Sequence, residues 1–298
     1  MSPAVVGAPP AAPAPAPAPS GPGDLKGLGG ARPVVATHVG KGLDATKPAP
    51  LVLVLHGYGG TGGEQLAYFG LSAVSDEVGF VVIAPDGTLD STGRRFWNAT
   101  DTCCDFEEKN VDDVGYLVGL VEEVKKRRAI DPRRVYVVGL SNGGSMAMRL
   151  ACDASTTFAA AISQAGLFFS DPGRCVPKEP VSFRHLHGTA DKLVPYEGGP
   201  IGSTIHPKAK PRTILSAKAL VAAFAKVDGC QAPLVELPAK IDLDVTQPGA
   251  ETTVARHEGC TKGSAVELWT IAGAGHVPMG LGAIGRVVWD FFAAHPKP

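Results

Sequence analysis

The sequence GLSNG at residues 139–143 fits the pattern G-x-S-x-G, with Ser141 at its centre. The apolar run VYVV before it predicts a buried strand, and the run after it is compatible with a helix. A serine on such a sharp turn can act as a nucleophile, and the glycines are needed because strand and helix come too close for neighbouring β-carbons. A glycine-rich turn without chemistry would show the same short pattern. The strand and the helix on either side favour Ser141 as a nucleophile.

A serine hydroxyl becomes nucleophilic when a histidine takes its proton, and an acid must orient that histidine. His276 lies in the glycine-rich loop IAGAGHVPMG, after the predicted strand VELWTI. Asp191 follows another predicted strand, VSFRHLHG. The order nucleophile, acid, histidine is the one that α/β-hydrolases use. Because each residue also follows a predicted strand, we expect Ser141, Asp191 and His276 to form a catalytic triad.

Other residues of the same types fit these roles less well. Asp112 and Asp113 precede the serine in the chain, and a helix cap at Asn110 accounts for the second of these acids. The histidines on or at the end of the strand VSFRHLHG are expected to be packed, hydrogen-bonded structural residues; these are His185 and His187. Surface positions are expected for four further histidines: His38, His206, His257 and His295.

The loop HGYGG at residues 56–60 follows the predicted strand LVLVL and matches the loop that supplies an oxyanion donor in such enzymes. The tetrahedral intermediate of acyl transfer carries negative charge, so two N–H groups must meet it. We expect the backbone N–H groups of Tyr58 and Asn142 to do so, and a structural role for His56. A phosphate-binding loop is the alternative, but the lysine and the serine or threonine of that motif are absent.

Apolar strands at 51–55, 80–84 and 135–139 alternate with helical patterns. Three more strands are predicted from FAAAIS, VSFRHLHG and VELWTI, and a final helix is predicted at 284–295. This alternation predicts an α/β fold with a mostly parallel central sheet and helices on both faces. We expect one catalytic domain over 33–298, preceded by a disordered Pro/Ala-rich segment at 1–32.

The composition excludes several classes of protein. The chain has 298 residues, of which 44% are hydrophobic and 19% are charged, and its net charge is −1. A near-neutral chain with no basic stripe is unsuited to nucleic acid as its main partner. No apolar run approaches the roughly 20 residues that a membrane span needs. The N-terminal residues also lack the charged start and continuous apolar core of a signal peptide, so no leader is visible.

Six cysteines lie in the chain and none forms a C-x-x-C pair, so neither a zinc site nor another metal is predicted. An even number favours disulfides and an oxidising compartment, although six reduced cysteines in a cytosolic protein would also fit. Cys230 and Cys260 bracket a polar excursion and are expected to pair. Cys103 and Cys104 are expected to bond elsewhere rather than to each other, because a bridge between neighbours is strained.

A series of motifs resembles the polyhydroxybutyrate depolymerase / feruloyl esterase family of secreted α/β-hydrolases. The motifs are LVLVLHGYGGTGG, APDG, FWNATDTCC, NVDDVGYL, VYVVGLSNGGSMAMRLAC, HLHGTADKLVPYEG and WTIAGAGHVPMG. The resemblance runs from about 35 to 295 and implies the same triad, with Trp97 near the acyl pocket. Many relatives carry His-x-Trp-Pro-Gly after the catalytic histidine, whereas this chain has HVPMG, so the substrate does not carry over.

We therefore expect a secreted or periplasmic serine esterase that works without a cofactor and takes a small or polymeric ester. Polyhydroxyalkanoate-type polyesters or oligomers, and feruloyl or acetyl esters of plant polysaccharide, are the candidate substrates. A peptidase or thioesterase on the same fold remains an alternative, because a triad does not determine the acyl substrate. A non-catalytic binding protein on a hydrolase scaffold is the other alternative. The sequence leaves the oligomeric state open.

Overall fold

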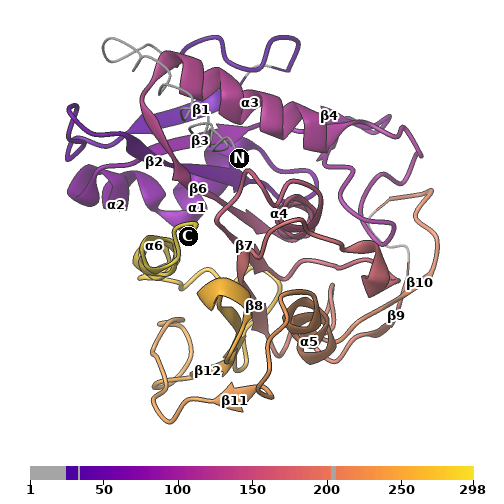
Figure 1. The fold of residues 1–298 in the computed structure, drawn as a ribbon. Helices are drawn as coiled ribbons and strands as arrows, with labels where there is room; N and C mark the ends of the chain where they lie inside the picture. Colours follow the sequence, from indigo (N-terminus) through magenta and orange to yellow (C-terminus); the bar gives the residue numbers. More distant parts are fainter. Residues whose placement is uncertain (1–24, 33, 203–205) are drawn as a thin grey trace, which may run out of the picture.

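The protein is described here by a computed structural model, which covers residues 25–32, 34–202 and 206–298. Within them a nine-stranded sheet has the order β1-β3-β2-β6-β7-β8-β13-β12-β11, and it runs through the middle of the molecule in Figure 1. All pairings from β3 to β13 are parallel, and β1, β12 and β11 add antiparallel edges. The predicted mostly parallel sheet is confirmed. The strands are β1 (Val34–Val39), β2 (Ala49–Leu55), β3 (Val81–Pro85), β6 (Ile130–Leu140), β7 (Ala160–Gln164), β8 (Ser182–Gly188), β11 (Val235–Glu236), β12 (Thr252–His257) and β13 (Val266–Ile271).

Helices cover both faces of this sheet because successive strand residues point to opposite sides. In β2, for example, Leu53 packs into one core and Val54 into the other. The first core holds buried residues of α3, α4 and α5, and the second holds those of α1, α2 and α6. The helices are α1 (Gly62–Phe69), α2 (Leu71–Val78), α3 (Asp113–Arg127), α4 (Asn142–Asp153), α5 (Ala217–Val227) and α6 (Ile284–Ala294).

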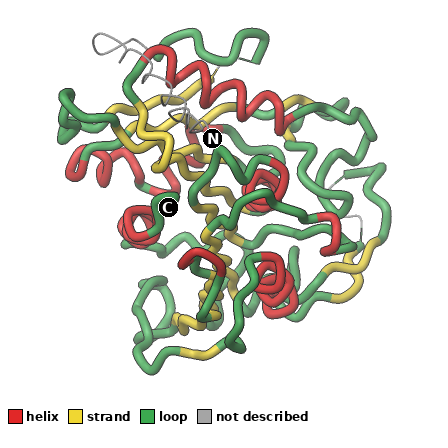
Figure 2. Tube along the Cα trace, in the orientation of Figure 1, coloured by secondary structure: helices red, strands yellow, loops and turns green. Residues whose placement is uncertain are grey.

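Two small hairpin-like sheets lie outside the main sheet. One pairs β4 (Thr88–Leu89) with β5 (Arg95–Phe96), and the other pairs β9 (Gly199–Ile201) with β10 (Arg212–Ile214). Both small sheets lie on the right-hand side of the view in Figure 1, and the described loop residues around them are green in Figure 2. A third apolar cluster lies outside the central sheet and joins Ile201 of β9 and Ile214 of β10 to loop residues that include Cys103 and Leu167. The hairpin of β9 and β10 and the loop at Cys103 are therefore packed together outside the central sheet.

The cap of α3 differs from the prediction. The side chain of Asp112, not that of Asn110, accepts the hydrogen bond from the N–H of Gly115. Asn110 has a positive φ of 53° and its side-chain amide donates to the carbonyl of Glu108 instead. Because the helix begins only at residue 113, the residue directly before it is the one placed to cap it.

The packed part of the chain begins earlier than predicted. Residues 25–32 belong to the predicted linker, yet Leu25 and Leu28 are buried in the first core. Arg32 forms an ion pair with Asp113, and its guanidinium lies 3.7 Å from the ring centroid of Tyr116. Burial of Leu25 and Leu28 removes apolar surface from water, which accounts for the packing of this segment against the core. Residues 1–24 of that prediction lie outside the described residues.

All six cysteines are paired, as Cys103–Cys104, Cys152–Cys175 and Cys230–Cys260. The expected pairing of Cys230 with Cys260 is confirmed. The expectation that Cys103 and Cys104 bond elsewhere was wrong, because they pair with each other. Their Cα atoms are 3.1 Å apart, and the peptide bond between them is cis.

Candidate active site

Ser141 lies at the turn between β6 and α4, at the carboxyl end of a central strand. Its backbone is in a sparsely populated conformation, with φ 54° and ψ −117°, and its N–H donates to the carbonyl of Gln164 at 2.7 Å. A β-carbon on Gly143 would lie 2.1 Å from the carbonyl oxygen of Leu55, and one on Gly139 would lie 2.2 Å from the backbone of Gly143. Only glycine therefore allows β6, β2 and α4 to meet at this serine.

Asp191 and His276 are brought together by two neighbouring strands. The loops that carry them follow β8 and β13, which pair in parallel, and the Nδ1 atom of His276 lies 2.6 Å from Oδ2 of Asp191. The other carboxylate oxygen accepts from the N–H groups of Leu193 and Val194, each at 2.8 Å. Burial alone would raise the pKa of Asp191, but hydrogen bonds from His187 and His276 hold that pKa well below its ordinary value. The acid is therefore ionised and rigidly held.

Ser141 and His276 line the same cavity, which has a volume of about 520 Å³. The Nε2 atom of His276 is buried and has no hydrogen-bond partner among the described residues. An imidazole whose Nδ1 donates to a carboxylate keeps Nε2 free of a proton, so this atom can accept one. The three predicted triad residues thus follow three parallel strands at their carboxyl ends; Ser141 and His276 line the cavity, and Asp191 is buried behind His276.

A chain of buried histidines lies behind the acid. Nε2 of His187 lies 2.9 Å from the carbonyl oxygen of Val194 and 3.3 Å from Oδ2 of Asp191. Its Nδ1 atom lies 3.1 Å from Nε2 of His185, whose pKa is lowered well below its ordinary value, first by burial. Both side chains are packed and hydrogen-bonded as expected. The sequence did not reveal that one of them contacts the acid.

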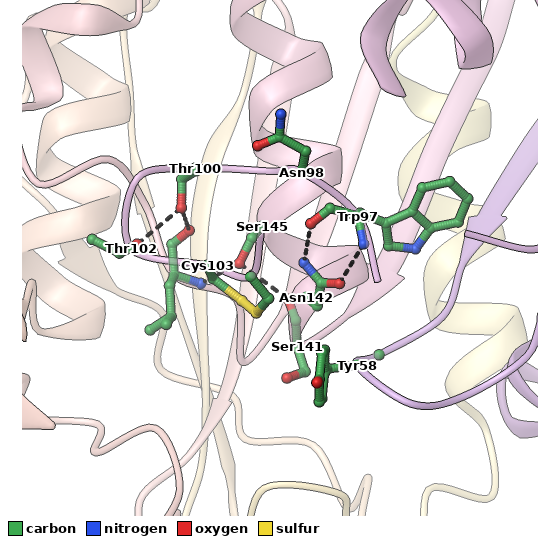
Figure 3. Close-up of a disulfide and its surroundings, with 12 residues drawn as sticks. Tyr58, Trp97, Asn98, Thr100, Thr102, Cys103, Ser141, Asn142 and Ser145 are labelled. Carbon is green, nitrogen blue, oxygen red and sulfur yellow. Dashed lines mark hydrogen bonds between the residues drawn. A yellow bond between two sulfur atoms is a disulfide. The ribbon is translucent and has the colours of Figure 1, made fainter. Parts of the chain in front are cut away.

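The N–H groups of Tyr58 and Asn142 both border the serine. As the first residue of α4, Asn142 has an N–H that no carbonyl of the preceding turn can accept. No acceptor for the N–H of Tyr58 lies among the described residues. Figure 3 shows Tyr58 and Asn142 beside Ser141, with the disulfide of Cys103 nearby. Both amides are therefore free to bind a ligand oxygen.

Trp97 supports the turn from behind instead of lining the cavity. Its backbone N–H donates to Oδ1 of Asn142 at 2.7 Å, and its carbonyl accepts from Nδ2 of the same side chain at 2.9 Å (Figure 3). Its indole is fully buried, and its Nε1 donates to the carbonyl of His56. Trp97, expected near the acyl pocket, therefore lies behind the turn and does not line the cavity, whereas Cys103 and Cys104 of the loop that follows it do. The wall facing Ser141 comes from Cys103, Cys104 and Leu167 instead.

The imidazole of His56 is also structural. Its Nδ1 lies 2.7 Å from the carbonyl of Gly57, and its Nε2 accepts from the N–H of Gly87 at 2.8 Å. Burial lowers the pKa of His56. With both ring nitrogens engaged, this neutral side chain secures the loop that carries Tyr58 and has no nitrogen left for a proton transfer.

The competing acids lie elsewhere. Asp112 caps α3, and Asp113 bonds to Arg32 and to the N–H of Asn98. His206 was expected on the surface but is buried, with its Nε2 3.8 Å from Asp90 and 3.6 Å from Glu107. The other three histidines with expected surface positions are half-buried: His38, His257 and His295. Within the described ranges no cluster of three or more His, Cys, Asp or Glu could hold a metal ion, and no helix is long and apolar enough to span a membrane.

The chain is similar to several known esterases. A putative esterase NocK from Nocardia uniformis subsp. tsuyamanensis is 30% identical over 76% of this chain and 64% of its own length. Feruloyl esterase B from Piromyces equi is 30% identical over 86% of this chain and 44% of its own, and a poly(3-hydroxybutyrate) depolymerase from Ralstonia pickettii is 36% identical over 37% and 23%. The chain thus spans less than two thirds of the length of these relatives.

The fold has counterparts among solved structures. An acetyl xylan esterase from Aspergillus awamori matches with a TM-score of 0.58 at 18% identity, over 86% of this chain and 92% of its own. A thermostable esterase matches with a TM-score of 0.54 at 14% identity, over 88% and 58%. These neighbours show the predicted α/β-hydrolase fold. Residues 36–185, just over half of the chain, match the family described as Esterase PHB depolymerase. The chain therefore belongs to the Esterase PHB depolymerase family.

Proposed function

We propose that the protein is a serine carboxylic-ester hydrolase that works through an acyl-enzyme. The observation that carries the proposal is the 2.6 Å hydrogen bond between Asp191 and His276, beside a cavity that Ser141 also lines. The family supports an ester as the substrate. The relatives are named for feruloyl, acetylxylan and 3-hydroxybutyrate esters, so polyhydroxyalkanoate-type polyesters or oligomers and feruloyl or acetyl esters are the candidate substrates.

In the proposed reaction, Nε2 of His276 takes the proton of Ser141 while Oγ attacks the ester carbonyl. The N–H groups of Tyr58 and Asn142 hold the oxyanion, and Asp191 keeps the imidazole in the tautomer that accepts at Nε2. His276 then gives its proton to the departing alcohol. A water molecule, deprotonated by the same imidazole, attacks the acyl group and releases the acid. The amide of Tyr58 belongs to the loop after β2 and that of Asn142 to the first turn of α4, so both segments must be in place for the reaction.

We also propose a secreted or periplasmic location. Three disulfides in one chain are typical of an oxidising compartment, because cytosolic thiols are kept reduced. Cell fractionation followed by detection of the protein would test this. Recovery of the protein with reduced cysteines from the cytosol would contradict it.

The function is tested with a fluorophosphonate probe and with p-nitrophenyl butyrate, on the wild-type protein and on Ser141→Ala. We expect the wild type to be labelled and to hydrolyse the ester, and the variant to do neither while keeping its fold by circular dichroism. Ser163→Ala is a matched control, because this buried serine lies on the neighbouring strand β7 and does not line the cavity. A wild type that is neither labelled nor active would contradict the proposal and favour a binding protein. Hydrolysis of peptides or thioesters, but not of oxygen esters, would favour the other alternative.

A further inference from the structure

The described residues that line the cavity beside Ser141 carry a net positive charge. Two of the described residues that line it are cations, Lys192 and Arg212, and none is an aspartate or a glutamate. Most of the others are apolar residues, glycines or prolines. A cavity with cationic walls and no carboxylate raises the local concentration of anions. An enzyme that recognised its substrate by shape alone would not need these two charges.

Arg212 differs from the cations around it. A second cavity, of about 510 Å³, lies on the other side of the disulfide and shares Cys103, Cys104 and Arg212 with the first. The four other cations that line this second cavity each have a carboxylate partner. The pairs are Arg149 with Asp153, Arg174 with Asp101, Lys208 with Glu107, and Lys210 with Glu108. Among the described residues, Arg212 has no carboxylate partner.

The guanidinium of Arg212 is nevertheless held in place. It lies 5.3 Å from the ring centroid of Phe106, and one of its terminal nitrogens, Nη1, donates to the carbonyl of Lys210 at 3.2 Å. Its Nε atom is buried with no acceptor among the described residues. Burial lowers the pKa of Arg212, and no neighbouring acid opposes this. A half-buried charge without a counter-charge costs free energy, which a bound anion would offset.

We propose that Arg212 binds a carboxylate group of the substrate, so that the enzyme prefers esters that also carry a free carboxylate. The guanidinium has a planar fork of donors, which matches the two oxygens of a carboxylate. Two kinds of substrate have this chemistry: a hydroxyacid oligomer with its acid end on the alcohol side, and a half-ester of a dicarboxylic acid, with the acid on the acyl side. This inference rests on the proposed function and specifies its substrate.

Two matched substrate pairs test the inference. The first pair is the dimer of 3-hydroxybutyrate and its methyl ester, and the second is monomethyl glutarate and dimethyl glutarate. Within each pair the free carboxylate is replaced by a neutral methyl ester, so kcat/KM is compared per ester bond that both members share. For at least one pair we expect the wild type to have a kcat/KM about tenfold or more higher for the acid. The pair that shows this preference tells which side of the ester faces Arg212. Added NaCl should reduce the preference, because salt screens a partly exposed charge pair.

The variant Arg212→Gln should bring the ratio of the two kcat/KM values close to one, mainly through KM for the acid. Arg212→Lys keeps the charge without the planar fork and should retain part of the preference. Arg286→Gln is the control, because this exposed arginine on α6 pairs with Asp290 and does not line the cavity. It should leave the ratio unchanged. An acid-to-ester ratio of one or less in the wild type for both pairs, or a ratio that Arg212→Gln leaves unchanged, would overturn the inference.

A binding measurement separates this inference from the proposed function. In the Ser141→Ala background, calorimetry with monomethyl glutarate and with the dimer of 3-hydroxybutyrate should show, for at least one of them, binding that is weakened about tenfold or more by Arg212→Gln. If the wild type hydrolyses no ester but this binding is seen, the function fails and the carboxylate site stands. If neutral esters are hydrolysed and Arg212→Gln changes neither binding nor preference, the function stands and the site fails.

Discussion

Asp191 and Asp113 are both aspartates whose side chains have no exposed surface. Asp191 lies in the loop after β8, and Asp113 is the first residue of α3. Each accepts hydrogen bonds from backbone N–H groups. Asp191 faces two histidines, whereas Asp113 faces Arg32. An imidazole can take up and release a proton near neutral pH, and a guanidinium cannot. A buried carboxylate can therefore orient a base or fasten a loop, and its partner decides which.

The pKa values of the two carboxyl groups are shifted in opposite directions. Burial raises the pKa of Asp113, and the contacts with Arg32 and the N–H of Asn98 only partly oppose this. For Asp191 the hydrogen bonds outweigh burial, and its pKa falls well below the ordinary value. The site with the lower pKa is the one that can stabilise an imidazolium during the reaction. Four predictions test this contrast.

The largest effect is expected from Asp191→Asn. An amide at this position favours the wrong tautomer of His276, so kcat for p-nitrophenyl butyrate should fall by about 10⁴-fold with the fold intact. Asp113→Asn is the matched control at an equally buried carboxylate and should keep activity within about tenfold. Steady-state kinetics with thermal melts of both variants provide the measurement. A greater loss in Asp113→Asn would reverse the assignment of the acid.

A loss of stability, not of chemistry, is expected from Arg32→Met. Removing the partly buried Arg32 leaves the fully buried Asp113 without its counter-charge, which costs about 3 kcal/mol of unfolding free energy. Urea unfolding would measure the loss, and kcat of the folded enzyme should change little. The double variant Arg32→Met/Asp113→Asn should lose less than the two single variants together, because it leaves no unpaired charge. Additive losses would show that the pair is not coupled.

Asp228 provides a third buried carboxylate, one with only weak partners. Burial raises its pKa from 3.8 to about 6, and Ser264 and the N–H of Val181 oppose this only in part. The folded state therefore holds the proton more tightly than the unfolded state, and the associated stability is lost as pH rises through about 4 to 6. Wild type should lose roughly 2–3 kcal/mol relative to Asp228→Asn between pH 4 and pH 7.5. Urea unfolding at both pH values measures this, and parallel curves for the two proteins would refute it.

The smallest effect is expected at His187, which contacts Asp191 from behind. His187→Phe removes the N–H that lies 3.3 Å from the carboxylate, so kcat should fall by about tenfold while KM changes little. His187→Gln keeps an amide donor and should lose less than the Phe variant. An equal loss in both variants would indicate that packing, and not the hydrogen bond, supports the acid.

The residues that carry out the proposed chemistry were readable from the sequence because each follows a strand of the parallel sheet. Ser141, Asp191 and His276 come after predicted strands whose carboxyl ends must meet at one edge of the sheet. The glycines around the serine were informative for the same reason, since a close approach of backbones excludes side chains. The pairing of Cys230 with Cys260 was readable because both cysteines flank one excursion of the chain.

The walls of the cavity could not be predicted, because they come from long loops without a periodic pattern. The pairing of Cys103 with Cys104 was not predicted, because the strain of a bridge between neighbours argued against it. The role of Trp97 could not be predicted because an aromatic residue near a site can either line the cavity or support the site from outside it. Arg212 carries no motif, and its isolation from carboxylates becomes visible only in three dimensions. The start of the packed chain was missed because Leu25 and Leu28 are too few to show a period.

The side chain of Asn142 imitates a peptide group. Its amide gives Trp97 one donor and one acceptor, the same exchange that two opposed residues make in an antiparallel ladder. These two hydrogen bonds join the loop at Trp97 to the turn that carries Ser141 in the way that a neighbouring strand would, although Trp97 is not in a strand. An aspartate at 142 would offer acceptors only and would leave the carbonyl of Trp97 without its donor. The loop that carries Trp97, 45 residues away in the sequence, therefore restricts which residues can replace Asn142, whatever the substrate is.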